Sequence, residues 1–252
     1  MTIETERLFS VGSSEYATAR PQYPPRLFDY LSNLAPDLDC AWDCGTGSGQ
    51  AAVALAERFN SVEATDVSPE QISEAAAHGR VRYSAQPAEA TAFEDGTFSL
   101  VTVAQALHWF DFNRFWPEVK RVLKPGGIFA AWVYTWPHIS EAADRIVAAE
   151  LLDIIKPYWA RENQLAWDGY ANVPFPFSEL AAPDLEMSLY WNLNQFMAYI
   201  GTWSATRRCV QEKGPGILAN LAATLEREWG DPTLSREVMM EFHCRVTGRG
   251  DR

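Results

Sequence analysis

Residues 40–50 read CAWDCGTGSGQ, and they carry the clearest indication of the fold. A short apolar run ends at Cys44, and Gly45, Gly47 and Gly49 then alternate with small polar residues. Glycine allows the backbone to turn tightly and lets a ligand approach more closely than a Cβ atom would permit. The following helix would offer unpaired N–H groups and the positive end of its dipole. The stretch predicts a strand, a turn over 45–49 that faces a ligand, and a helix.

The spacing of the glycines separates several kinds of nucleotide-binding loop. A phosphate-binding loop of the ATPase type requires Gly-Lys-Ser/Thr, and no lysine follows Gly49. A dinucleotide-binding loop has the pattern G-x-G-x-x-G, whereas the third glycine here comes one residue early. A lone G-x-G-x-G can be a simple turn, but Asp43 precedes it and Asp66 ends the next predicted strand. A carboxylate at position 66 can accept hydrogen bonds from both hydroxyls of an adenosine ribose, although Asp66 also suits the start of a helix.

The segments around this turn alternate between strand and helix, which predicts a parallel, doubly wound sheet with right-handed crossovers. The predicted elements are strands at 38–44, 61–65, 81–84, 98–104 and 128–134, and helices at 26–34, 50–59, 69–78 and 115–123.

The second half of the chain departs from this alternation. Two strands there would form an antiparallel edge pair, and the helices between them would form a cap over the carboxyl edge of the sheet. The fold class is therefore α/β, with a Rossmann-like, doubly wound, seven-stranded and mostly parallel sheet plus a helical cap. The predicted elements are a long helix at 141–158, a loop-rich segment at 159–183, strands at 185–193 and 237–246, and helices at 195–209 and 216–229. The predicted organisation is lid helices at 1–37, one of them near 14–19, a ligand-binding core at 38–136, the cap and closing strands at 137–246, and a disordered tail at 247–252.

The amino-acid composition argues against several classes of function. The 21 basic and 33 acidic residues give a net charge of −12, which disfavours nucleic acid as a partner. No run of about 18 apolar residues predicts a membrane span, and the first residues lack the pattern of a secretory signal. Four cysteines in 252 residues do not make a disulfide framework, and the spacing of Cys40 and Cys44 does not suit zinc. We expect a cytoplasmic protein with reduced thiols, no metal and a small-molecule partner, and the sequence leaves its oligomeric state open.

Four segments together resemble the class I S-adenosylmethionine-dependent methyltransferases. Within that class the chain resembles the small-molecule group that includes trans-aconitate methyltransferases and the type 11 methyltransferases, over residues 16–134. The order and spacing of the four segments are more specific than any one of them. The segments are AWDCGTGSGQ at 41–50, EATDVS at 63–68, AQPAEATAFEDGTFSLVTVAQALHWF at 85–110 and RVLKPGGIFAAW at 121–132.

The resemblance implies S-adenosylmethionine as the cofactor and assigns roles to matching positions. Asp66 would hold the ribose, Val67 would pack on the adenine, and Gln105 would close the pocket beside the methionine part. Ala88 and Glu89 would lie at the adenine edge, with Glu89 equally suited to an exposed loop. Asp43, Gly45 and Gly47 would lie along the methionine part, and Thr46 and Gly49 belong to the same cofactor-binding turn.

The segment YATARPQYP at 16–24 resembles the lid of this group. Tyr16, Arg20 and Tyr23 would fold over the cofactor, and Arg20 can pair with the carboxylate of the cofactor or with an anionic substrate. A surface arginine stacked on a tyrosine is an equally good interpretation of Arg20.

The implied reaction is the transfer of an already activated methyl group to a small molecule by in-line displacement. A base is needed only if the acceptor must lose a proton, so a hydroxyl acceptor needs one and a carboxylate does not. His108, after the fourth predicted strand, is the best candidate base, and His138 is second; His108 also suits a packed position beside Trp109. Cap tryptophans favour an apolar or aromatic acceptor and Arg207-Arg208 a carboxylate; the tryptophans are Trp136, Trp159, Trp167, Trp191 and Trp203.

Two other functions remain open at the level of sequence. An NAD(P)-dependent oxidoreductase shares the sheet, the turn and the ribose-binding acid, but the early third glycine and the lack of a Tyr-x-x-x-Lys pattern argue against it. A protein of methyltransferase fold that binds the cofactor without catalysis is the second alternative.

Overall fold

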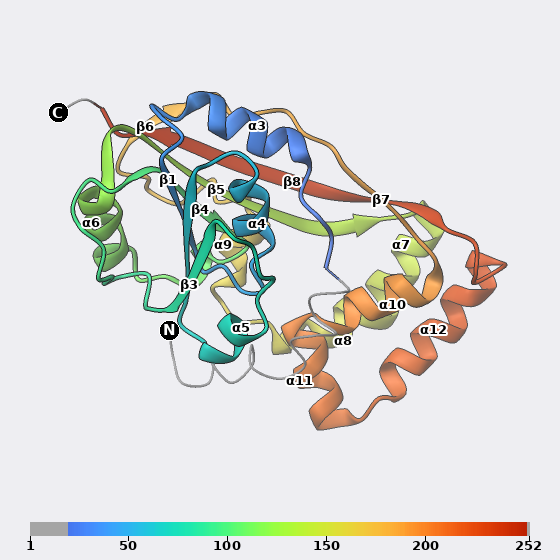
Figure 1. Ribbon diagram of the computed structural model, residues 1–252. Coiled ribbons are helices and arrows are strands. Elements are labelled where there is room, and N and C mark those ends of the chain that lie inside the picture. The colour runs from blue at the N-terminus through green and yellow to red at the C-terminus, as the bar shows by residue number, and fades with distance from the viewer. Residues whose placement is uncertain (1–19, 251–252) are drawn as a thin grey trace.

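The computed structural model describes residues 20–250, so Tyr16 and the helix predicted near 14–19 lie outside the described residues. The strands form one sheet with the order β3-β2-β1-β4-β5-β8-β6, and β7 also pairs with β8. The first five strands run parallel, and β8 runs antiparallel to β5, which confirms the predicted fold class (Figure 1). The strands are β1 Cys40–Cys44, β2 Ser61–Asp66, β3 Val81–Ala85, β4 Phe98–Ala104, β5 Leu123–His138, β6 Ser178–Leu180, β7 Met187–Trp191 and β8 Arg236–Gly248.

The sheet has one strand more than the seven that were predicted. The additional strand is β6, which lies in the segment predicted to be loop. It pairs with the C-terminal end of β8, and β7 pairs with the N-terminal end of the same strand. Two short strands thus share the outer side of β8, where the sequence predicted one strand.

Helices cover both faces of the parallel strands. On one face α3 and α4 bury Phe28 and Leu55 against Trp132. On the other face α6 buries Phe115 against Trp42 and Phe129. The residues of β4 are buried almost throughout, because helices cover both faces of the sheet at this strand. The sequence of such a strand is a nearly continuous apolar run. These helices are α3 Pro25–Leu34, α4 Gln50–Ala56, α5 Pro69–Ser73 and α6 Phe112–Val122.

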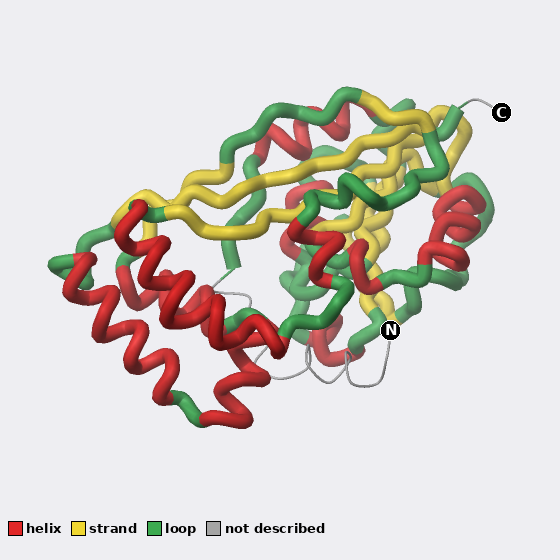
Figure 2. Tube along the Cα trace, turned by 180° about the vertical axis from the view of Figure 1, so that it is seen from behind, coloured by secondary structure: helices red, strands yellow, loops and turns green. Residues whose placement is uncertain are grey.

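The helical cap packs below the far ends of β5, β7 and β8, which extend beyond the other strands (Figures 1 and 2). Its buried residues form a separate apolar cluster that includes Leu151, Phe196 and Leu225. A π-helical turn at Ala148–Leu152 and a 3₁₀ turn at Lys156–Tyr158 interrupt the predicted long helix. The cap helices are α7 Glu141–Val147, α8 Asp153–Ile155, α10 Leu193–Gly201, α11 Ser204–Lys213 and α12 Gly216–Trp229. The short helix α9 Asn163–Trp167 packs instead on the core, where its Ala166 belongs to the same cluster as Trp42.

Two predicted helices have different limits in the structure. The helix predicted over 195–209 is divided between α10 and α11, because the backbone of Trp203 is extended and the Thr202 hydroxyl donates to the Tyr199 carbonyl at 2.6 Å. The helix predicted over 69–78 ends at Ser73. The Ala76 N–H then donates to the Ser48 carbonyl at 3.0 Å, which turns the chain back toward the glycine turn. None of the helices within residues 20–250 has the length and apolar character needed to cross a membrane.

The prediction that the disordered tail begins at residue 247 is wrong for its first residues, which belong to a strand. Thr247 and Gly248 belong to β8, and only 2% of Thr247 is exposed. The Arg249 N–H donates to the Gly127 carbonyl at 2.9 Å, and the Gly126 N–H donates to the Arg249 carbonyl at 2.9 Å. The reason is that Thr247 and Gly248 pair with Phe129 and Ile128 of β5 on one side and with β6 on the other, so β8 has partners to its end. At its other end β5 continues to His138, past the predicted core boundary at 136.

We predict that a chain ending at Val246 is less stable than one ending at Gly250. The shorter chain loses several backbone hydrogen bonds to β5 and β6, for which we expect a loss of about 3 kcal/mol, or roughly 6–12 °C in melting temperature. Circular dichroism melts of both truncations and the full chain measure this. Equal melting temperatures for the two truncations would show that the last residues of β8 do not contribute.

Candidate functional site

The turn after β1 has a backbone that requires glycine. Gly45, Gly47 and Gly49 all have positive φ angles, of 70°, 55° and 83°. A Cβ atom on Gly45 would lie only 2.8 Å from the Cβ atom of Ala106, and one on Gly49 would collide with the ring of Tyr83. The turn therefore combines a left-handed backbone, which glycine adopts without strain, with close packing on two sides.

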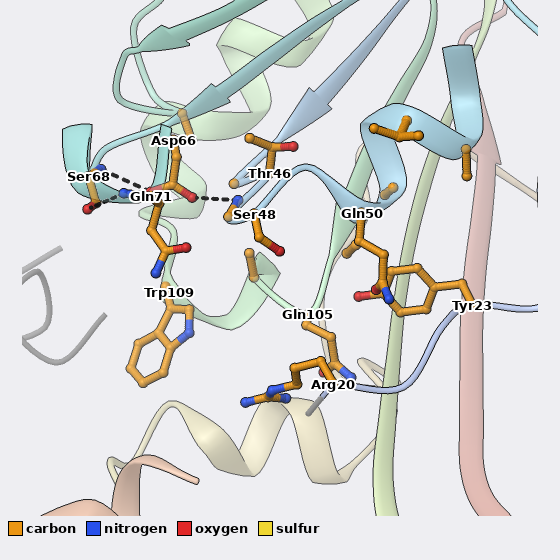
Figure 3. Close-up of a pocket in the computed structure, with 18 of the residues that line it drawn as sticks. Arg20, Tyr23, Thr46, Ser48, Gln50, Asp66, Ser68, Gln71, Gln105 and Trp109 are labelled. Atoms are coloured by element: carbon orange, nitrogen blue, oxygen red, sulfur yellow. Dashed lines mark hydrogen bonds between the residues drawn. The ribbon is translucent and has the colours of Figure 1, made fainter. Parts of the chain in front are cut away.

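The end of β2 holds this turn in place. The Gly45 and Thr46 N–H groups both donate to the Thr65 carbonyl, at 2.8 and 2.9 Å. One carboxylate oxygen of Asp66 accepts from the Gly47 N–H at 2.9 Å, and the other accepts from the Ser68 N–H at 2.9 Å (Figure 3). Burial raises the pKa of Asp66, and these two backbone donors offset part of that effect.

A cavity of about 870 Å³ opens at the carboxyl ends of β1, β2 and β4. This is the edge at which open parallel sheets bind their ligands. The structure brings together here most of the residues that the sequence suggested for the cofactor, which are Arg20, Gly45, Thr46, Gly47, Asp66, Val67, Ala88, Glu89 and Gln105.

Asp43 and Gly49 do not line this cavity, contrary to the cofactor contacts expected of them. Asp43 is fully buried, and its carboxylate accepts from the Thr46 hydroxyl at 2.6 Å and from the Thr102 hydroxyl at 2.9 Å. Burial raises the pKa of Asp43 to about 6. Asp43 thus supports the turn from inside the sheet, while Gly49 leaves room for Tyr83. The alternation of glycines with small polar residues did not indicate which residues of this segment would face the core of the sheet.

Gln105 and Arg20 lie across the cavity from Asp66 (Figure 3). Gln105 has a φ of 58°, which is unusual for a residue with a side chain, and its amide donates to the Tyr134 carbonyl at 3.2 Å. The Arg20 guanidinium donates to the Tyr134 hydroxyl at 3.0 Å. Tyr134 and Trp109 are cavity residues that the sequence analysis missed. Trp109 follows β4 and Tyr134 lies late in β5, and these positions at the carboxyl edge of the sheet could have indicated that both residues line the cavity.

The position of Glu89 suits both roles suggested for it, a residue beside the cofactor and an acid in a loop. It lines the cavity, and its carboxylate accepts from the Asp111 N–H at 3.1 Å, directly before α6. The same carboxylate can therefore fix a loop and face a ligand.

A second cavity of about 120 Å³ adjoins the first. Arg20, Gln105, Trp109 and Tyr134 line both cavities and form the boundary between them. The remaining wall comes from the 3₁₀ turn at Leu107–Trp109, the end of β5, α9 and the cap, and includes His108, Trp136, Trp159, Asn163, Trp167, Trp203 and Arg207. Trp191, also suggested by the sequence, contacts Tyr199 but does not line this cavity.

His108 lies in a 3₁₀ turn at Leu107–Trp109 and is 6% exposed. Its Nδ1 atom is 3.2 Å from the Tyr170 hydroxyl. Burial lowers the pKa of His108 to about 3, so the ring is neutral at neutral pH and is a weak base. This geometry favours the packed position over the catalytic one. His138 lines neither cavity and lies between Asp144 and Glu241.

The larger cavity fits a nucleoside-bearing cofactor. Asp66 offers a carboxylate, Val67 and Ala88 offer apolar contact, and Gly45 and Gly47 bring the backbone of the turn to the cavity wall. The fold and site thus define an α/β protein that binds a nucleoside cofactor at the carboxyl edge of its sheet.

Comparison of this chain with known proteins identifies its family. A model of the methyltransferase domain matches residues 42–131. A Dictyostelium discoideum protein named a methyltransferase is 30% identical over 221 residues, which span 86% of this chain and 84% of that protein. A solved structure from Anaeromyxobacter dehalogenans, assigned as a type II methyltransferase, is 38% identical with a TM-score of 0.85, covering 92% of this chain and 99% of that one.

The fold is also that of phosphoethanolamine N-methyltransferase 2 from Haemonchus contortus, solved with S-adenosylhomocysteine. That structure is 15% identical with a TM-score of 0.50, and the match covers 96% of this chain and 57% of that one. The chain belongs to the class I S-adenosylmethionine-dependent methyltransferases, and its cofactor is S-adenosylmethionine. This assignment replaces both the dehydrogenase and the non-catalytic alternatives.

The raised pKa of Asp43 predicts a pH-dependent contribution to stability. The pKa in the folded protein, about 6, lies above the ordinary value of 3.8, so the contribution is favourable below 3.8 and is lost as the pH rises toward 6. Relative to Asp43→Asn, the wild type should lose about 2 kcal/mol of unfolding free energy between about pH 4 and about pH 7. Urea unfolding across this range measures the difference, and the same comparison of the wild type with Asp168→Asn is the control. A constant difference at position 43 would contradict the prediction.

Proposed function

We propose that this methyltransferase transfers the methyl group to the carboxylate of a small-molecule acceptor. The larger cavity would hold the cofactor and the smaller one the acceptor. The observation that carries the proposal is the shared boundary of Arg20, Gln105, Trp109 and Tyr134, because two reactants must meet there. The cofactor, when bound, supplies a methyl group on a sulfonium, and the protein must then position the acceptor and exclude water.

The proposed cofactor contacts follow from the wall of the larger cavity. Asp66 would accept hydrogen bonds from the ribose hydroxyls, since each carboxylate oxygen retains a lone pair beyond its one backbone donor. Val67 and Ala88 would pack on the adenine, with Glu89 at its edge. The turn residues Gly45, Thr46 and Gly47 would lie along the methionine part, with Gln105 and Arg20 beyond them.

A carboxylate fits the smaller cavity better than a hydroxyl does. Among residues 20–250 its wall carries Arg20 and Arg207 but no aspartate, glutamate or lysine. The one histidine on the wall, His108, is buried and neutral. A hydroxyl acceptor would need a base there, whereas a carboxylate is already ionised near pH 7 and is attracted by guanidinium groups.

For the cofactor site, we predict that Asp66→Ala weakens binding of S-adenosylhomocysteine by about 1–3 kcal/mol, or roughly 5–150-fold in Kd. The reason is the loss of charged hydrogen bonds to the ribose. Titration calorimetry measures this, with Asp168→Ala as a matched control because Asp168 bonds only to exposed Gln164 and Asn172 in the described contacts. Asp66→Asn, which keeps one acceptor oxygen, should lose less. Unchanged affinity in a folded Asp66→Ala protein would refute the assigned role.

For the acceptor, we predict that methyl transfer from labelled cofactor proceeds to carboxylic acids and not to the matching alcohols. Without a base, kcat should be nearly constant between about pH 6 and about pH 9, and His108→Gln should reduce it by less than about tenfold. Rates measured for acid and alcohol pairs in wild type and variant test this. A loss of about 10²–10⁴-fold in His108→Gln, or a preference for alcohols, would contradict the proposal.

A further inference from the structure

Four tryptophans form one continuous wall of the smaller cavity. Trp136 comes from β5, Trp159 follows the 3₁₀ turn at Lys156–Tyr158, Trp167 ends α9, and Trp203 precedes α11. The ring centroids of Trp136 and Trp167 and those of Trp159 and Trp167 are 5.5 Å apart. Trp203 lies 5.9 Å from Trp136 and 6.0 Å from Trp159. Since these rings touch one another, a ligand would lie against the wall rather than between its members.

Asn163 adds a polar group to the same wall. It lies at the start of α9 and is 8% exposed, and its side-chain oxygen is buried without a hydrogen-bond partner. Burying an amide oxygen without a hydrogen bond is destabilising, so such a group calls for a specific partner. Its place on the cavity wall points to a hydrogen-bonding group on the ligand.

Charge decides between two kinds of ligand for an aromatic wall. Tryptophan rings bind cations such as quaternary ammonium groups, and they also pack on flat aromatic rings. The described part of this wall has two arginines and no acidic residue, which repels a cation and attracts an anion. The volume of about 120 Å³ is close to the roughly 150 Å³ of a cavity that binds benzene.

We propose that the smaller cavity takes a single-ring aromatic carboxylic acid that carries a hydrogen-bond donor. The ring lies against the tryptophan wall, the donor faces Asn163, and the carboxylate faces Arg20 at the boundary with the larger cavity. This inference rests on the proposed function. In the reaction, a carboxylate oxygen forms the new bond to the methyl carbon, the carbon–sulfur bond breaks, and its electron pair stays on sulfur. No proton moves, and the product is a methyl ester.

The experiment measures binding of four probes to the full chain saturated with S-adenosylhomocysteine. The probes are benzoate, hydroxybenzoate, cyclohexanecarboxylate and benzyltrimethylammonium. We expect benzoate to bind roughly 2–10-fold more tightly than cyclohexanecarboxylate, and hydroxybenzoate about 5-fold more tightly than benzoate. The ammonium probe should bind most weakly. Preference for the ammonium, or equal affinity for the flat and the saturated ring, would overturn the inference.

Variants connect these preferences to the wall. Trp167→Leu should weaken benzoate binding by about tenfold, and Asn163→Ala should abolish the preference for hydroxybenzoate over benzoate. Trp191→Leu is the matched control, because Trp191, at the end of β7, packs against the apolar cluster of the cap but does not line the cavity. Equal effects of Trp167→Leu and Trp191→Leu would overturn the inference.

Binding of S-adenosylhomocysteine separates the two proposals. The three variants should bind it as the wild type does, because their side chains lie outside the larger cavity. A wild type that binds S-adenosylhomocysteine but shows no preference for aromatic acids would overturn this inference alone. A wild type that transfers no methyl group to any carboxylic acid would overturn the proposed function as well.

Discussion

The site depends on the attachment of the glycine turn to the end of β2. The Thr65 carbonyl accepts two N–H groups of the turn, and the Asp66 carboxylate accepts a third. This attachment is possible because β1 and β2 are parallel neighbours, so that their carboxyl ends lie at the same edge. Asp66 is buried at some cost, and the backbone donors of Gly47 and Ser68 are what make its charged form tolerable there. The carboxylate that shapes the turn is therefore the same one that faces the cavity.

Much of the cofactor side was predictable, because its chemistry lies within short local segments. The glycines and Asp66 sit directly after predicted strands, and topology then brings them together. The inward orientation of Asp43 was not predictable, because a single sequence does not show whether an acid beside a turn faces the ligand or the core. Its burial follows from two hydroxyl donors, of which Thr102 is 59 residues away along the chain.

The acceptor side was less predictable, since it is assembled from segments far apart in the chain. The tryptophans of the wall come from four separate segments of the chain, and nothing local marks Asn163 as a cavity residue. The break at Thr202 and Trp203 also depends on tertiary packing, because Trp203 is buried in the apolar cluster of the cap. The eighth strand, β6, has only three residues and exists because β8 extends to Gly248. Such features follow from long-range pairing, which periodicity does not report.

The overall charge of the protein and the charge of its proposed acceptor site have opposite signs. A net charge of −12 repels an anionic acceptor at long range. Salt screens exposed charges over roughly 8–10 Å, so the distant acids contribute little inside the cavity, where Arg20 and Arg207 line the wall. The apolar wall then becomes the selective element: a small aliphatic anion gains only the attraction of the arginines, whereas an aromatic anion also gains contact with the indole rings. Selection by the arginines and the tryptophans together would favour the aromatic acid even though the molecule as a whole repels anions.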